Sequence, residues 1–321
     1  MIAPLDPSSV LPWEAGLEIE EAPAGAPGVS IVVPIYNSGK FLEKTLRSML
    51  CNDLRGCEVI VMDGGSTDDT PRILDHYASM FTLRVSERDK GQSDAINRGF
   101  ERATRPVLYW LNGDDILLPN ALTQVRKDFA ANPGTDFLVG DAYMTEIDFK
   151  PIRHFRFSPE KLEFEFLLDY ARNHLVQPSV FFSRKAWAAA GPVKLDMHYA
   201  MDADLFIGMA RRFKGRHLPC DIAYSVYHED CKTRAHRAES ISELALVQAS
   251  HGGLQQAART MDILLNMHKD LQGRFTELEG QAATLEREAN ERTRVLELKA
   301  EALVAEHDRN RRLMLEADIH V

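Results

Sequence analysis

The stretch VLYWLNGDD, residues 107–115, joins an apolar run to an abrupt polar end. Residues 106–111 have the composition of a strand that is buried on both faces. The following NGDD, residues 112–115, places two adjacent carboxylates directly beyond that strand. Carboxylates in such a position are costly to desolvate, so we expect a cation or a polar ligand that offsets their charge.

Three similar strand–helix pairs precede this stretch. We expect strands at 29–35, 57–63 and 82–87, and helices at 38–50, 66–80 and 93–103. Strand–helix alternation at this spacing predicts a doubly wound, mostly parallel α/β sheet. Ligands of such sheets bind beyond the carboxyl ends of the strands, where the chain places Tyr36 and Asn37 and the polar segments 63–66, 87–91 and 112–115. These segments therefore predict one shared site.

Two common phosphate-binding motifs are missing from the sequence. The first strand ends in PIYNSGK and lacks the GxGxxG of dinucleotide-binding folds, and no GxxxxGK[ST] is present. Phosphates would then be held through a metal ion on carboxylates, for which Mg²⁺ or Mn²⁺ is the natural choice.

Size and composition limit the remaining interpretations. The chain has 321 residues, 45% of them hydrophobic, and a formal net charge of −10, which argues against a nucleic-acid partner. The four cysteines show no metal-site or disulfide spacing, and neither a secretory signal nor a membrane span is recognisable. We expect a cytoplasmic protein, with a peripheral position at the inner face of the cell membrane as an alternative.

Composition divides the chain into three segments. Residues 1–28 are rich in Pro, Ala and Gly and predict a flexible leader. Residues 29–235 contain the strand–helix units, and residues 236–321 are strongly helical with a coiled coil from about 262.

The ordered set VSIVVPIYN, EVIVMDGGSTDDT, DKGQSDAINRGF and VLYWLNGDD resembles the GT-A domain of family 2 inverting glycosyltransferases. Each motif alone is weak, but their order over residues 29–235 is specific. The resemblance implies transfer of a sugar from a nucleoside diphosphate to a hydroxyl group, with Mn²⁺ or Mg²⁺ as cofactor. It favours uridine diphosphate over the guanosine and thymidine donors, and a glycan or lipid-linked glycan as acceptor.

The resemblance also implies donor-binding residues. Pro34 and Tyr36 would line the nucleobase pocket, Asp63 would bind the base or ribose, and Asp94 and Arg98 would lie near the nucleoside and phosphates. Asp63 could instead be a turn residue before two glycines. Asp68 and Asp69 are interpreted as helix caps, with Ser66 or Thr67 as a further cap. The loop charges Arg88 and Lys90 are interpreted as solvated.

The NGDD segment matches the position of the family's metal-binding DxD motif. Asp114 corresponds to the second Asp, whereas Asn112 replaces the first and is either a neutral metal ligand or a turn residue. Gly113 lies between them. Asp115 is interpreted as an acceptor-side contact or as a support for the metal site.

The acceptor half is expected at residues 174–207. By resemblance, Asp202 in HYAMDADLF is the general base, although a helix-capping role is the alternative. Asp204 is the second candidate, and Gln177 with Pro178 would shape the acceptor pocket. His228 would help to hold the metal or the diphosphate, or is structural, and Lys232 and Arg234 would cover the diphosphate. His198 and His217 are interpreted as structural.

Leucines recur at seven-residue steps near the end of the chain, at 264, 271, 278 and 285. Phe275, Leu296 and Leu303 occupy the complementary position, with alanines at 282 and 289. This heptad pattern predicts a self-associating coiled coil and a homo-oligomer, dimer or trimer. Arg292, Lys299 and Glu306 interrupt it, and a helix packed on the catalytic domain is the alternative.

The sequence therefore predicts a metal-dependent glycosyltransferase with a helical extension. The competing class is a non-catalytic scaffold, in which a degenerate transferase domain is displayed by the coil. The set of Asp63, Asp114 and Asp202 argues for the enzyme.

Overall fold

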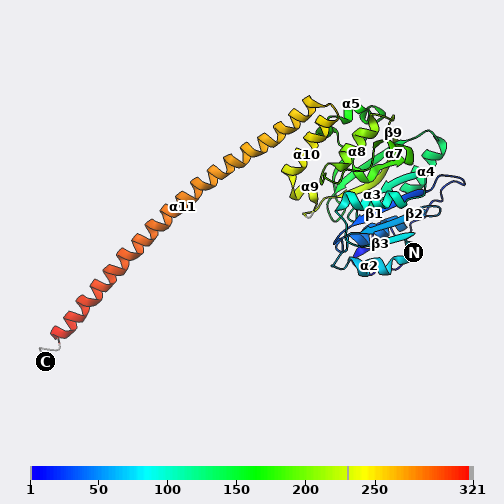
Figure 1. Cartoon of the computed structure of the whole chain (residues 1–321). Helices are drawn as coiled ribbons and strands as arrows, with labels where there is room; N and C mark the ends of the chain where they lie inside the picture. The colour runs from blue at the N-terminus through cyan, green and yellow to red at the C-terminus, as the bar shows by residue number, and fades with distance from the viewer. Residues whose placement is uncertain (1, 230, 318–321) are drawn as a thin grey trace. The chain divides into compact units, whose positions relative to one another are not determined.

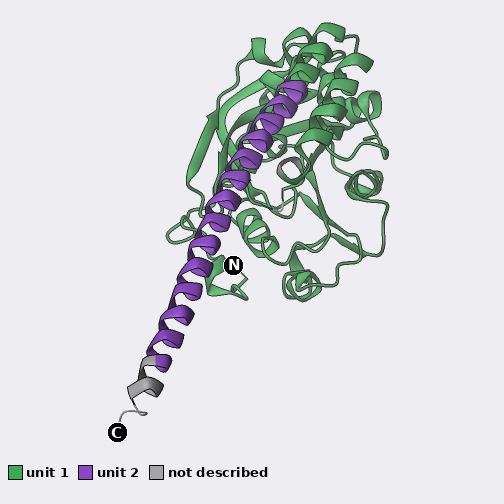
Figure 2. Ribbon diagram, turned by 90° about the vertical axis from the view of Figure 1, so that its left-hand side faces the viewer, with its two compact units in different colours: residues 1–262 green, residues 263–321 purple. Residues whose placement is uncertain are grey.

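A computed structural model describes residues 2–229 and 231–317, without the side chains of 233, 234 and 313–317. The expected role of the Arg234 side chain thus lies outside the described residues. The chain divides into two compact units, residues 1–262 and 263–321 (Figure 2).

One mixed β-sheet of nine strands forms the centre of the first unit (Figure 1). Its order is β3-β2-β1-β4-β8-β6-β9-β5, and β7 pairs with β6. The strands are β1 Val29–Ile35, β2 Glu58–Asp63, β3 Leu83–Ser86, β4 Val107–Trp110, β5 Ile116–Leu117, β6 Phe137–Thr145, β7 Pro151–Phe155, β8 Val180–Ser183 and β9 Arg216–Val226.

The two halves of the sheet differ in strand direction. Strands β1 to β4 run parallel to one another, as the strand–helix alternation predicts. Beyond β4, strand β8 is antiparallel to both β4 and β6, β9 is parallel to β6, and β5 and β7 form antiparallel edges. The expected α/β fold is confirmed, but the sheet is more mixed than expected.

Helices cover both faces of the sheet, because side chains of a strand alternate between its faces. Val32 of β1 packs in one core cluster with α3, α7 and α8, whereas Ile31 and Val33 pack in the other with α1, α2 and α4. The helices are α1 Leu42–Leu50, α2 Thr70–His76, α3 Gln92–Arg102, α4 Ala121–Ala131, α5 Phe164–Leu167, α6 Tyr170–Asn173, α7 Arg184–Ala190, α8 Met201–Ala210, α9 Lys232–Ala235, α10 Arg237–Ser250 and α11 Leu254–Ala317.

Close packing of α3 on β1 requires a glycine. A Cβ atom added to Gly99 would lie 2.4 Å from Cγ1 of Val32, closer than side-chain atoms approach. Gly99 therefore lets α3 lie directly on the strand that carries the first half of the site.

The N-terminal segment packs against the rest of the first unit and is not the flexible leader that its composition suggested. Leu11 is 1% exposed, and the Glu43 carboxylate of α1 accepts hydrogen bonds from the Asp6 backbone and the Ser9 hydroxyl. Arg47 of α1 forms an ion pair with Glu14. Composition alone misses these contacts because their partners lie more than 30 residues away in the sequence.

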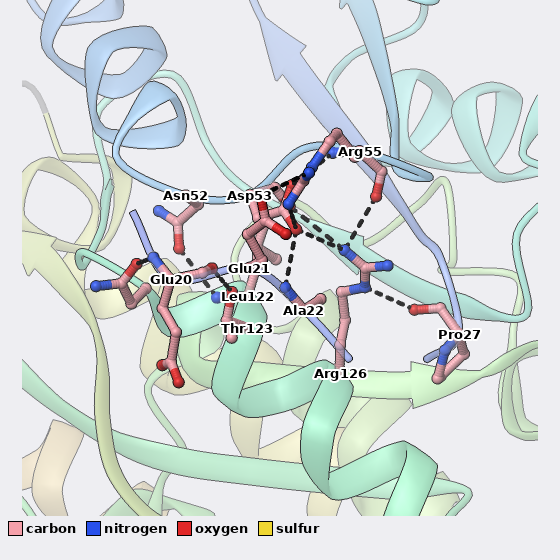
Figure 3. A network of polar contacts seen from close by, with 11 residues as sticks. Glu20, Glu21, Ala22, Pro27, Asn52, Asp53, Arg55, Leu122, Thr123 and Arg126 are labelled. Atoms are coloured by element: carbon pink, nitrogen blue, oxygen red, sulfur yellow. Dashed lines mark hydrogen bonds and ion pairs between the residues drawn. The ribbon is translucent and has the colours of Figure 1, made fainter. Parts of the chain in front are cut away.

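A polar network anchors the end of the same segment (Figure 3). Asp53 accepts the Ala22 amide at 2.9 Å and pairs with Arg55 at 2.8 Å, and Arg126 of α4 donates to the Pro27 carbonyl at 3.0 Å. The Arg55 guanidinium holds the pKa of Asp53 well below its usual value. These contacts fix the path of the backbone that enters β1.

The second unit consists of the greater part of α11, a 64-residue helix that begins in the first unit. Leu271, Leu278, Leu285 and Leu296 of this helix are 62% to 66% exposed. No described helix of the chain combines the length and apolarity needed to cross a membrane.

Candidate active site

A large cleft lies beyond the carboxyl ends of β1, β2 and β4. Its volume is about 1060 Å³, and it is lined by segments from the whole length of the first unit. Of the residues expected at the site, the lining includes Pro34, Tyr36, Asn112, Gly113, Asp114, Asp115, Gln177, Asp202 and His228. A cleft of this size can enclose a nucleotide-linked sugar.

Asp114 and His228 meet in this cleft. Asp114 follows β4 and His228 follows β9, and the Asp114 Oδ2 lies 3.0 Å from the His228 Nε2. The Phe41 ring stacks on the imidazole with a centroid distance of 4.1 Å. Gly113 lets this loop lie close to β1, since an added Cβ would be 2.6 Å from Cγ2 of Ile35.

The donor atoms around Asp114 fit a divalent cation. Carboxylate, imidazole and thiol atoms of Asp114, His228 and Cys231 all lie within 4.8 Å of one another. The His228 Nδ1 is buried and has no hydrogen-bond partner among the described residues, where the contacts at Nε2 and with the Phe41 ring orient the imidazole. The imidazole and thiol donors favour a first-row transition metal over Mg²⁺, which prefers oxygen ligands.

Asn112 holds the site together through its side-chain amide. Its Nδ2 donates to the Gln177 Oε1 at 2.9 Å and to the Asp115 Oδ2 at 3.1 Å. Its Oδ1 accepts a hydrogen bond from the Gln92 Nε2 at 2.8 Å. A cation at Oδ1 would share that oxygen with Gln92, whereas the amide nitrogen positions Gln177 and Asp115.

Asp115 is buried and connects the same loop to β9. It is 5% exposed and accepts a hydrogen bond from the Val226 amide at 3.2 Å. Burial, together with the neighbouring Asp114, raises the pKa of Asp115 well above its usual value. Asp115 therefore orders the loop and the strand end.

Asp202 lines the same cleft from the first turn of α8. Burial raises the pKa of its carboxyl to about 6, although its Oδ1 accepts the Ala203 amide at 2.8 Å. A carboxylate with this pKa is well suited to accept a proton near neutral pH. The helix N-cap is Ala200, so Asp202 is not the capping residue.

Glu243 of α10 organises the segment before Asp202. Its carboxylate accepts hydrogen bonds from the backbone amides of His198 at 2.9 Å, Tyr199 at 2.7 Å and Ala200 at 3.0 Å. These amides belong to the segment that leads into α8, so Glu243 places a negative charge close to the helix N-terminus, which favours the helix dipole. Glu243 was missed from the sequence because nothing in its local pattern indicates this partner.

Five of the expected site residues are not part of the cleft lining, namely Asp63, Asp94, Arg98, Pro178 and Asp204. Asp63 is 3% exposed and accepts the Ser66 amide at 3.0 Å, which ties the end of β2 to the following turn. Asp204 lies 2.9 Å from the Lys194 Nζ and 3.0 Å from the His251 Nε2. Asp204 therefore contacts different partners from those of Asp202, which lies two residues earlier on the helix.

Asp94 and Arg98 are also occupied by local contacts. Asp94 accepts the Lys90 amide at 3.2 Å, and its carboxylate lies 3.8 Å from the Arg98 guanidinium. Arg98 also forms an ion pair with Glu87. Both residues order the turn between β3 and α3, which carries the cleft residues Arg88 and Gln92.

The helix after β2 begins only partly as expected. The α2 N-cap is Asp69, without a side-chain cap, while Asp68 accepts the Thr70 and Gly39 amides. Ser66 donates to Asp63 instead of capping the helix. Asp68 is thus a turn residue on the cleft wall.

Lys232 reaches the cleft from the segment after His228. Its Nζ donates to the Gln92 Oε1 at 2.9 Å, so the contacts run from Lys232 through Gln92 to Asn112. Gln92 was missed from the sequence, where the neighbouring Asp94 was preferred. The position after Gly91, at the start of a helix beyond a strand, was the available signal.

The fold and the cleft define the GT-A class of glycosyltransferases. Residues 30–189 match the family model described as glycosyl transferase family 2. The chain belongs to this family and is a glycosyltransferase.

Curated relatives support the assignment. Chondroitin synthase of Escherichia coli is 28% identical over 207 residues, which cover 60% of this chain and 28% of the relative. The PGL/p-HBAD biosynthesis glycosyltransferase of Mycobacterium tuberculosis is 28% identical over 186 residues, which cover 57% of this chain and 69% of that protein. This chain thus spans only a minor part of chondroitin synthase.

Solved structures show the same fold. TarS of S. aureus superposes with a TM-score of 0.51 at 19% identity, covering 68% of this chain and 39% of TarS. The mannosyltransferase PcManGT from Pyrobaculum calidifontis, solved in complex with GDP-Man and Mn²⁺, gives a TM-score of 0.50 at 17% identity and covers 78% of each chain. The expected fold class is confirmed by these likenesses.

Proposed function

We propose that the chain is an inverting glycosyltransferase with a nucleoside diphosphate sugar as donor. The acceptor would be a hydroxyl of a glycan or lipid-linked glycan, in the cytoplasm or at the inner face of the cell membrane, as in surface polysaccharide synthesis. The observation that carries the proposal is the presence of Asp202, with its raised pKa, in the same cleft as the Asp114–His228 pair.

Asp202 would act as the general base. Its carboxylate takes the proton of the acceptor hydroxyl while the oxygen attacks the anomeric carbon. A new carbon–oxygen bond forms as the bond between the anomeric carbon and the diphosphate breaks, and the nucleoside diphosphate leaves. Attack from the face opposite the leaving group inverts the anomeric configuration.

Asp114 and His228 would hold a divalent cation, Mn²⁺ or Mg²⁺. The ion, when bound, offsets the charge that develops on the departing diphosphate. Lys232, in contact with Gln92, is placed to add a positive charge on the same side. Hydrogen bonds with Asn112 would position the side chains of Gln92, Gln177 and Asp115 around the ion.

The donor side of the cleft fits a nucleoside through Pro34, Tyr36 and the turn after β2. We favour a uridine nucleotide on the family resemblance. One structural neighbour, TarS 1-349, was solved in complex with UDP-GlcNAc, whereas PcManGT was solved with GDP-Man. A thermal-shift screen of the full chain against uridine, guanosine and thymidine diphosphates with Mn²⁺ identifies the nucleobase.

Transfer assays with two variants test the reaction. Asp202→Asn is expected to lower kcat by roughly 10² to 10⁴-fold, because general base catalysis is lost, while nucleotide affinity stays near wild type. Asp114→Asn should lower kcat and should also weaken Mn²⁺-dependent nucleotide binding. Product NMR with the identified donor reports whether the configuration inverts. Wild-type protein that neither binds nor turns over any donor would overturn the proposal, and retention would overturn the mechanism.

We also propose that α11 self-associates as a coiled coil from about residue 262. Leu271, Phe275, Leu278 and Leu285 are exposed along the single helix, which is an unfavourable arrangement for an isolated chain in water. Pairing of these positions between copies would bury them. Dimer and trimer are both compatible with the small Ala282 and Ala289 at core positions.

A further inference from the structure

A second group of potential metal ligands lies outside the active-site cleft. Asp141 of β6, His154 of β7, and His217 and Asp221 of β9 form one cluster on three neighbouring strands. The His154 Nε2 lies 2.7 Å from the Asp221 Oδ1, and the His217 Nε2 lies 2.8 Å from the Asp141 Oδ1. None of the four lines the cleft.

The strand register places two carboxylates side by side. Gly140 pairs with Leu218, but the next residue, Asp141, pairs with Asp221, so β9 carries two extra residues at this point. Like charges directly opposite each other destabilise a sheet. The shift therefore creates an electrostatic cost that a nearby positive charge would remove.

The donor atoms of three of these residues are close enough for one cation. Oxygen and nitrogen atoms of Asp141, His154 and Asp221 all lie within 4.8 Å of one another. Zinc bonds of about 2.0 to 2.2 Å in a tetrahedral site put ligand atoms roughly 3.3 Å apart, so small side-chain shifts suffice. Two carboxylates and an imidazole would give a neutral site with a divalent ion.

The surrounding contacts orient these ligands. The Asp141 Oδ1 accepts the Phe157 amide at 2.9 Å and faces His217, which leaves Oδ2 to bind an ion. The Tyr143 ring stacks on His154 at a centroid distance of 3.9 Å and an angle of 7°. Such outer contacts fix the ligands of metal sites.

One contact would have to change on binding. The Arg156 Nε donates to the His154 Nδ1 at 3.3 Å, a long hydrogen bond from an exposed side chain. When Nε2 binds a cation, Nδ1 carries the proton and Arg156 moves into solvent. Two hydrogen-bonded His–Asp pairs without a metal are the competing explanation of the same geometry.

We propose that Asp141, His154 and Asp221 bind one Zn²⁺ ion, with His217 as the residue that positions Asp141. The imidazole–carboxylate donor set matches zinc in type and number, and water completes the coordination. The ion would join β7, β6 and β9. Because β9 continues into Val226 and the His228 segment, it would brace the strand that leads to the cleft.

Zinc binding by the full chain tests this proposal. Metal is removed with a chelator, Zn²⁺ is added back, and bound zinc is measured by mass spectrometry and calorimetry without nucleotide. Asp114→Asn removes a possible metal ligand of the cleft and should still bind one Zn²⁺ per chain, so every further variant is made in the Asp114→Asn background. His154→Gln and Asp221→Asn should each bind at least tenfold more weakly, while His76→Gln, a change at an exposed histidine, should bind as wild type.

Cobalt provides a second readout. Co²⁺ in place of Zn²⁺ should give a visible absorption band in wild type and in Asp114→Asn, and lose it in His154→Gln. If His154→Gln does not fold, Asp221→Asn decides, because that carboxylate is 40% exposed. Loss of zinc binding in Asp114→Asn would overturn the proposal. Undiminished zinc binding in both His154→Gln and Asp221→Asn would also overturn it. Nucleotide binding and transfer are measured separately, so failure here leaves the proposed reaction intact.

Discussion

Asp202 carries a raised pKa, and the reaction rate should report it. The burial that raises its pKa to about 6 means that the carboxylate form, which accepts a proton, is lost below that pH. We expect kcat/KM to fall tenfold per pH unit on the acid side, with an apparent pKa near 6. The measurement is a pH–rate profile at saturating metal. A flat profile between pH 5 and 7 would exclude Asp202 as the base.

The same shift has a cost in folding free energy. The folded state holds the Asp202 proton more tightly than the unfolded chain, whose pKa is 3.8, so stability falls as pH rises from about 4 to 6 and then stays low. Asp202→Asn removes this cost and should stabilise the protein by roughly 3 kcal/mol at pH 7, but by little at pH 4. Urea unfolding at the two pH values measures the difference. An equal change in the free energy of unfolding at pH 4 and at pH 7 would contradict the assigned pKa.

At the scale of single residues, sequence reasoning identified the residues whose role depends on their position along the chain. Asp114 was indicated by a strand end and Asp202 by the family resemblance, and both line the cleft. The roles of Asn112 and Asp115 depend on Gln177 and Val226, which lie 65 and 111 residues away. Such partners are set by the tertiary fold, and no local pattern contains them.

At the scale of elements, α10 holds the start of α8 through Glu243. We expect Glu243→Gln to lower kcat about tenfold, because one of the acceptor oxygens becomes a donor facing backbone amides. Nucleotide affinity should stay within about twofold of wild type, since the donor half of the cleft is built from other elements. Steady-state kinetics with separate nucleotide-binding titrations measure the two effects.

Glu239→Gln is the matched control for this change. Glu239 lies on the same helix and is exposed, so its substitution should leave kcat unchanged. Equal losses in both variants would point to a general effect of charge on α10. Loss of nucleotide binding in Glu243→Gln would show that the helix supports the whole cleft.

Strand prediction succeeded where strands are apolar and locally regular. The runs that became β1, β2 and β4 are buried along their whole length, and their β-branched composition indicated this. The long β9 contains Pro219, charged residues and register shifts, so it has no clear period in the sequence. The packing of residues 2–28 was also missed, because a segment rich in Pro, Ala and Gly has no periodicity to reveal its contacts.

At the scale of the whole molecule, α11 determines the proposed oligomeric state. Leu278→Asp should dissociate the oligomer, because a charge at a heptad core position cannot be buried between helices. Glu279→Ala, one position along, lies outside the leucine register and should leave the assembly intact. Light scattering coupled to gel filtration gives the molar mass of each. Wild type that runs as a monomer at high concentration would contradict self-association.

The order of strands in the sheet also has a consequence for synthesis on the ribosome. Strand β4 pairs with β1 on one side and with β8 on the other, yet residues 111–179 separate β4 from β8 in the chain. At ordinary elongation rates this segment takes on the order of 10 s to make. During that interval the nascent chain exposes an unpaired, apolar edge at β4, which invites association with other chains. We therefore expect the growing polypeptide to depend on chaperones until β8 has emerged.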